Sequence, residues 1–154
     1  MSTQSRPTGP AARSGQLTAS RLWLVGATAI VASAVVNLLI ESLAVGVFGL
    51  PAEFPPFASV AIIASTLIGV GGATVVFGLV QRLSRQPART FITVAIIALV
   101  VSLIPNALAL VSPDGLPFPG TSPTAIGALS LMHLAAAAIS VTMLTKFAPT
   151  SGLD

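Results

Sequence analysis

The sequence contains no cysteine and no tyrosine, and it has a single histidine and very few charged residues. The absence of cysteine excludes disulfides, thiolate metal sites, iron–sulfur clusters and thiol redox chemistry. Only 7% of the 154 residues are charged, whereas 54% are hydrophobic. Because ordinary globular proteins have about 25% charged residues, the composition excludes a water-soluble fold and predicts that the chain is dissolved in lipid.

The net charge of +3 does not indicate a nucleic-acid partner. The seven basic residues are scattered along the chain, so they form no continuous patch that would follow a phosphate backbone. We therefore expect no nucleic-acid binding, and the partner that the composition does indicate is the lipid bilayer.

Four long apolar runs predict four transmembrane helices. Each run is long enough to cross a hydrocarbon core of about 30 Å, which requires about 20 helical residues. Proline-rich segments separate the first run from the second and the third run from the fourth. A short polar hairpin joins the second run to the third. We expect an all-α polytopic membrane protein whose four helices form an antiparallel bundle. The predicted segments are a disordered cytoplasmic tail at 1–20, a membrane domain at 21–147 with helices at about 22–48, 57–80, 89–111 and 124–146, and a cytoplasmic tail at 148–154.

The distribution of charge predicts the orientation of this bundle. With both termini in the cytoplasm, all basic residues lie on the cytoplasmic side, and the external loops carry only Glu53 and Asp114. The basic residues are Arg6, Arg13, Arg21, Arg82, Arg85, Arg89 and Lys146. The positive-inside rule thus favours an orientation with both termini in the cytoplasm. A signal peptide cleaved near Ala32–Ala34 is the competing interpretation, and the apolar run disfavours it by continuing to Leu50.

Small residues in the second span predict close packing between helices. Helices in lipid associate through small residues and through hydrogen bonds between polar side chains. The predicted packing residues are Gly69, Gly71, Gly72 and Ala73. A phosphate-binding loop is disfavoured for this glycine cluster, because no Lys-Ser/Thr follows it and it lies at membrane depth.

The polar residues of the spans predict a cluster in the outer half of the bundle. Polar side chains recur every four residues in several spans, and they should face inward because they are costly against acyl chains. At about 1.5 Å of rise per residue, four of them reach similar depths: Glu41, Asn37, Asn106 and His133. Pro105 is expected to kink the third helix just before Asn106, and a role for Pro105 in bundle shape alone stays open.

Two interpretations stay open for each ionisable member of this cluster. Glu41 is a proton or cation site paired with Asn106 or His133, or it lies beyond the hydrocarbon because the first run is longer than a span needs. His133 is a proton relay or a structural hydrogen-bonding residue. No metal or cofactor is expected, since Glu41 and His133 offer two ligands where zinc needs three or four. The sequence also lacks G-x-S-x-G and H-E-x-x-H motifs, so no catalytic constellation indicates an enzyme.

Together these features resemble an uncharacterised family of bacterial four-span integral membrane proteins, the domain of unknown function 6069. The similarity covers about Arg21 to Phe147. It rests on Asn37 and Glu41 in the long first span, the Pro-rich loop after it, the Pro105-Asn106 pair and the segment Leu131–Ala136. The resemblance implies a small protein of the bacterial cytoplasmic membrane and carries no established activity. Small multidrug exporters are less similar, because Glu41 lies near the outer end of its span and tyrosine is absent.

The sequence therefore leads to two hypotheses about function. The first is a non-catalytic structural or regulatory membrane module, whose polar cluster organises the bundle or a homo-oligomer. The second is a small proton-linked carrier or ligand-binding protein in which Glu41 and His133 change protonation. In both hypotheses the protein is an integral part of the bilayer.

Overall fold

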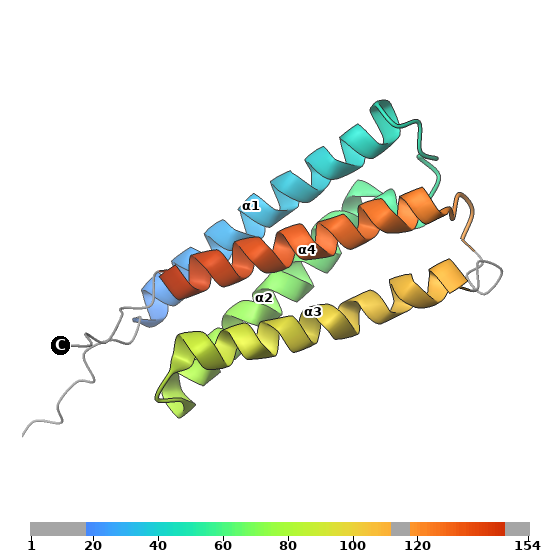
Figure 1. The fold of residues 1–154 in the computed structure, drawn as a ribbon. Coiled ribbons are helices and arrows are strands. Elements are labelled where there is room, and N and C mark those ends of the chain that lie inside the picture. Colours follow the sequence, from blue (N-terminus) through green and yellow to red (C-terminus); the bar gives the residue numbers. More distant parts are fainter. Residues whose placement is uncertain (1–17, 112–117, 147–154) are drawn as a thin grey trace, which may run out of the picture.

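The computed structural model describes residues 18–111 and 118–146, which form a bundle of four α-helices (Figure 1). The elements are α1 (Ala19–Gly46), a short 3-10 turn η1 (Pro55–Phe57), α2 (Ser59–Leu83), α3 (Pro87–Val111) and α4 (Pro123–Lys146). No strand occurs in the described part of the chain. The predicted all-α four-helix bundle is confirmed. Most of the two predicted tails lies outside the described residues, as do Arg6, Arg13 and Asp114.

All four helices are long and apolar enough to cross a membrane. They contain 24 to 28 residues, which corresponds to about 36 to 42 Å at the usual helical rise. Large apolar side chains point outward along every helix, with Leu24, Ile68 and Val100 among them. In water these side chains would be an aggregation hazard, whereas in a bilayer they contact acyl chains. The chain is a multi-pass membrane protein.

Local sequence signals explain where the helices begin. The Ser122 hydroxyl accepts a hydrogen bond from the Ala125 backbone N–H at 3.1 Å, and Pro123 takes the first helical position of α4. Pro87 likewise starts α3. α1 starts at Ala19, three residues before the predicted start at 22, and α2 continues to Leu83, three residues beyond the predicted end at 80.

The helices alternate in direction, so the bundle has two distinct ends. The hairpin end contains the α2–α3 hairpin, the start of α1 and the end of α4 (Figure 1). The loop end contains η1 and the start of α4. α1 packs extensively against α2 and α4, and α4 also packs against α3. α2 and α3 have far less contact, and Figure 1 shows them close together at the hairpin and separating towards the loop end.

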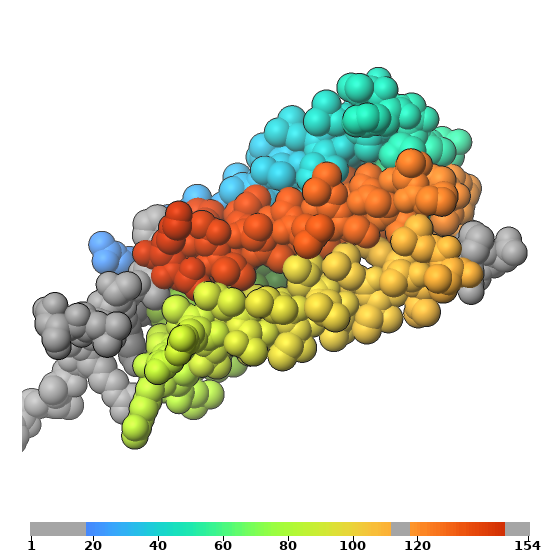
Figure 2. Space-filling view, in the orientation of Figure 1, coloured from blue at the N-terminus to red at the C-terminus, as the bar shows by residue number. Residues whose placement is uncertain are grey.

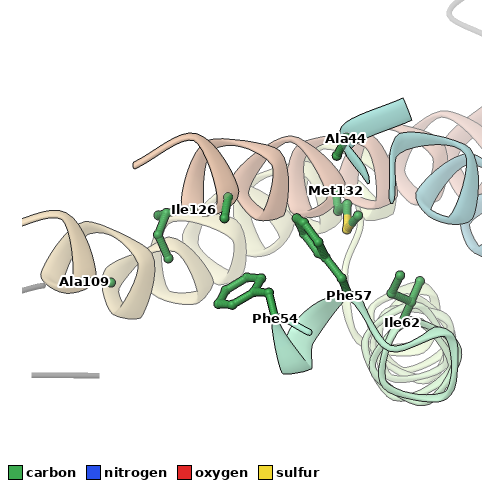
Figure 3. Packing of buried hydrophobic residues seen from close by; sticks show 8 residues of the cluster. Ala44, Phe54, Phe57, Ile62, Ala109, Ile126 and Met132 are labelled. Atoms are coloured by element: carbon green, nitrogen blue, oxygen red, sulfur yellow. The ribbon is translucent and has the colours of Figure 1, made fainter. Parts of the chain in front are cut away.

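An apolar cluster fills each end of the bundle. At the loop end, Phe54 and Phe57 are almost fully buried, and their rings meet edge to face at a centroid distance of 5.0 Å. Figure 3 shows both rings projecting from the loop towards Ile126 and Met132 of α4. We call this set the loop-end cluster: Ala44, Phe54, Phe57, Ile62, Ala109, Ala125, Ile126 and Met132.

The hairpin-end cluster consists of Phe77, Phe91 and Leu144, which come from α2, α3 and α4. The Phe77 and Phe91 rings also lie edge to face, with centroids 5.0 Å apart. Each of the three side chains is at most 1% exposed. The bundle is therefore tightly packed at both ends, where aromatic rings fill the space between helices.

The closest approach between helices occurs at glycines of α1 and α2. A Cβ added to Gly26 would collide with the Thr74 side chain, and one added to Gly78 would come within 2.8 Å of Leu22. By contrast, a Cβ on Gly69 or Gly72 would meet no atom within 4 Å. Of the four packing residues expected in the second span, Ala73 packs against the hairpin-end cluster and a Cβ on Gly71 would lie 4.0 Å from Ile30, whereas Gly69 and Gly72 have open space beside them. The buried row of α2 contains Thr66, Val70 and Thr74.

Candidate functional site

A cavity of about 310 Å³ lies between α2, α3 and α4, with Asn37 of α1 contributing to its wall. In the space-filling view α3 and α4 form the near face, and a narrow gap between them shows α2 behind (Figure 2). Most lining side chains are apolar. The polar lining residues come from all four helices and are Asn37, Ser65, Thr66, Ser102, His133 and Ser140.

Asn37 is buried, with 6% of its surface exposed. Its Nδ2 donates a hydrogen bond to Thr66 Oγ1 at 3.1 Å, which joins α1 to α2. Its Oδ1 has no hydrogen-bond partner among the described residues. Buried polar atoms are satisfied in most native structures, and one left without a partner costs about 1–3 kcal/mol. The cavity wall thus contains a carbonyl oxygen that lacks a donor.

His133 lines the same cavity from α4. Its Nδ1 lies 2.8 Å from the Leu129 carbonyl oxygen. Because a carbonyl only accepts hydrogen bonds, the proton of the neutral ring is on Nδ1, and Nε2 is left as an acceptor. No bond to Nε2 occurs within the described residues.

The serines of the cavity also present acceptors. The hydroxyls of Ser65, Ser102 and Ser140 donate to carbonyl oxygens of their own helices, at 3.1, 2.8 and 2.7 Å respectively. A serine that has used its single proton in this way retains lone pairs and offers no donor. Hydrogen-bond acceptors therefore outnumber donors on the polar part of the wall.

Of the four residues predicted to form a polar cluster, the structure places two in the cavity wall and two outside it. Asn37 and His133 line one cavity. Asn106 is buried, but its Nδ2 donates to Ser130 Oγ at 3.0 Å, and it does not line the cavity. Glu41 is half-buried, and it accepts a long hydrogen bond of 3.4 Å from the Ser42 hydroxyl. In the described part of the chain, no bond joins Glu41 to Asn106 or to His133.

Pro105 lies within α3, which continues as a helix to Val111. Its ring nitrogen cannot donate to the Val101 carbonyl. Ser102, which could have compensated for this loss, donates to Leu99 instead. The predicted kink at Pro105 remains a prediction.

The pairing of Asn37 with Thr66 was not predicted from the sequence. The available signal was depth, since Thr66 lies roughly 10 Å from the start of α2 and Asn37 roughly 14 Å from the end of α1. Two polar residues at similar depth on consecutive antiparallel helices are good candidates for an interhelical hydrogen bond. The rotation of α2 about its axis decides whether Thr66 or Ser65 faces inward, and that rotation is not a local property.

A family model matches residues 17–150 of this chain. The protein belongs to the family of unknown function DUF6069. No curated protein and no solved structure matches the chain. The family assignment confirms the resemblance seen in the sequence, and it brings no activity with it. The feature of this DUF6069 protein that points to a function is the cavity.

The chemistry of the cavity is restricted by its lining. Among the described residues, no Asp, Glu, Lys or Arg lines it. Within residues 18–111 and 118–146, no three His, Cys, Asp or Glu side chains come together in a way that could hold a metal ion. The arrangement suits a molecule that fills apolar space and donates one or two hydrogen bonds.

Proposed function

We propose that this protein is a non-catalytic ligand-binding membrane protein. Its cavity would take a small, neutral and mainly apolar molecule that carries a hydrogen-bond donor. The observation that supports this proposal is a mainly apolar cavity lined by Asn37, a buried residue whose Oδ1 has no hydrogen-bond partner among the described residues. A purely structural role for Asn37 accounts for its bond to Thr66 and leaves the oxygen unexplained.

The volume limits the size of the ligand. A cavity of about 310 Å³ equals roughly ten water molecules at about 30 Å³ each, and it lies at the lower end of the range for ligand pockets. The wall between the polar groups consists of side chains such as Ile62, Val70 and Met132. These values support a molecule of roughly ten non-hydrogen atoms with an aliphatic or aromatic body.

The polar groups support a neutral donor over a charged ligand. An anion needs several donors, whereas the serines of the wall have used theirs within their own helices and the Thr66 hydroxyl is the main donor left among the described lining residues. A cation would be buried with no carboxylate in the wall, at a large desolvation cost. A hydroxyl or amide N–H meets neither obstacle, because it can donate to Asn37 Oδ1 or His133 Nε2. Glu41 does not line the cavity, so the proposal includes no proton-coupled step.

The test compares two probes that differ only in the donor. Octan-1-ol and octyl methyl ether compete, in proteoliposomes, with a diazirine-bearing octanol that labels the cavity wall on illumination. We expect Asn37→Leu to weaken competition by the alcohol about fivefold, since a hydrogen bond contributes about 1 kcal/mol. Competition by the ether should not change.

Asn106→Leu is the matched control for this test. It also removes a buried hydrogen bond between helices, but Asn106 lies outside the cavity. It should therefore leave the preference for alcohol over ether intact. The proposal fails if Asn37→Leu weakens both competitors equally, or if both variants behave alike.

We also infer that the hairpin end faces the cytoplasm. In the described part of the chain, the basic residues at this end are Arg21, Arg82, Arg85, Arg89 and Lys146, while Glu53 lies at the loop end. This separation of charge supports the N-in, C-in orientation of a cytoplasmic-membrane protein.

A further inference from the structure

The cavity is closed towards both ends of the bundle. Ile62 and Met132 of the loop-end cluster form part of its wall, and behind them Phe54 and Phe57 are at most 2% exposed. At the other end Phe91 belongs both to the cavity wall and to the hairpin-end cluster. Close-packed aromatic side chains leave no passage for a molecule of the proposed size. A molecule of the proposed size would have to displace these aromatic side chains to pass through either cluster.

The side of the bundle is open where α2 faces α3. Three residues of the cavity wall are exposed, and all three are small: Ser65 and Gly69 of α2, and Ala98 of α3. A Cβ added to Gly69 would meet no atom within 4 Å. We call these three residues the mouth. α2 and α3 have little contact with each other, and the wall residues that are exposed on them carry short side chains.

The surroundings of the mouth are apolar. Ile68 of α2 and Ile97 of α3, which neighbour mouth residues in the sequence, are 75% and 58% exposed. All four helices are long and apolar enough to span a membrane. At this depth the mouth faces acyl chains, and a molecule at the mouth is dissolved in the bilayer.

We propose that the ligand is a membrane-dissolved amphiphile, such as an aliphatic alcohol, that enters the cavity sideways from the bilayer between α2 and α3. This inference rests on the proposed function. The donor of the ligand is bound at Asn37, and its apolar body lies along the cavity and extends through the mouth. Lateral entry avoids both aromatic clusters, and the small mouth residues leave the path unobstructed.

Gly69→Leu tests this route, because it places a branched side chain in the mouth. Gly72→Leu is the matched control, since Gly72 is also exposed on α2, has no neighbour within 4 Å of a Cβ and does not line the cavity. Proteoliposomes equilibrated with the diazirine-bearing octanol are mixed with excess octan-1-ol and illuminated at increasing times. The loss of labelling measures the rate of exchange. We expect Gly69→Leu to slow exchange at least tenfold, and Gly72→Leu to leave it within twofold of the wild-type rate.

Two further variants test entry through the ends. Phe57→Leu and Phe77→Leu each make one aromatic cluster smaller while keeping it apolar, and neither residue lines the cavity. Lateral entry predicts that their exchange rates stay within twofold of the wild-type rate. Faster exchange in either variant would show entry through that end, and it would overturn the proposal whether or not Gly69→Leu still binds the probe.

The result also separates this inference from the proposed function. Alcohol-selective labelling with the wild-type exchange rate in Gly69→Leu would overturn lateral entry and leave the binding proposal standing. Absence of alcohol-selective labelling in the wild-type protein would refute both. Labelling that falls as the protein-to-lipid ratio rises would show that a second copy of the chain covers the mouth, which also contradicts entry from lipid.

Discussion

The contact between Gly26 and Thr74 allows a quantitative test of how α1 and α2 are packed. A Cβ at position 26 would collide with the Thr74 side chain, approaching its Oγ1 to 2.7 Å and its Cβ to 3.1 Å. Thr74 is 1% exposed, and its hydroxyl donates to the Val70 carbonyl oxygen at 2.9 Å. The threonine is thus confined by burial and by its own hydrogen bond, so it cannot move aside at low cost.

We expect Gly26→Ala to lower the free energy of unfolding by about 1–3 kcal/mol, the usual cost of overpacking a well-packed site. Thr74→Ala removes the colliding methyl and hydroxyl groups and should cost about 1 kcal/mol through lost burial. In the double variant the collision is largely relieved. Its destabilisation should therefore be smaller than the sum of the single effects by at least about 1 kcal/mol, within the range of coupling between neighbouring residues.

The measurement is SDS-induced unfolding in mixed micelles, followed by far-UV circular dichroism for the two single variants, the double variant and the wild-type protein. Gly72→Ala is the control, because a Cβ there meets no atom within 4 Å, so only the higher helix propensity of alanine acts and should raise the free energy of unfolding by about 0.4–1 kcal/mol. Additive effects of Gly26→Ala and Thr74→Ala would refute the reasoning, since they would show that the two residues are not in contact.

Three further predictions concern the α3–α4 interface, the proline of α3 and the orientation. Ser130→Ala removes the acceptor of the hydrogen bond that joins α3 to α4 and should destabilise the bundle by about 0.6–1.7 kcal/mol. Ser140→Ala is the control, because the Ser140 hydroxyl bonds within its own helix, and it should cost less in the same SDS titration. Equal losses of stability in the two variants would contradict this prediction. Pro105→Ala restores a backbone donor in α3 and should raise the free energy of unfolding by up to about 3 kcal/mol, whereas a loss would show that the bundle requires the proline. In intact cells a membrane-impermeant maleimide should label Ala52→Cys and not Gln86→Cys, and the reverse pattern would invert the proposed orientation.

The sequence by itself determined the number of helices and the segments that form them. The length of an apolar run, the prolines that interrupt it and the Ser122-Pro123 start of α4 are local features, and the backbone of each helix satisfies its own hydrogen bonds. Local signals therefore decided the presence and type of each element. The positions of helix ends were less well determined, since α1 starts at Ala19, three residues before the predicted start, and its first residues are exposed.

Only the tertiary structure decided which face of each helix turns inward. A helix that is apolar on all sides has a weak periodic signal, so its rotation depends on its neighbours. On α2, Ser65 and Thr66 are adjacent in the sequence and lie on different faces of the helix. The hydrogen bond from Asn37 is made to Thr66. The rotation of α2 also leaves Gly69 at the mouth of the cavity, whereas Gly26 of α1 packs against Thr74 of α2. The sequence alone does not distinguish these two environments, because each residue is a glycine within an apolar span.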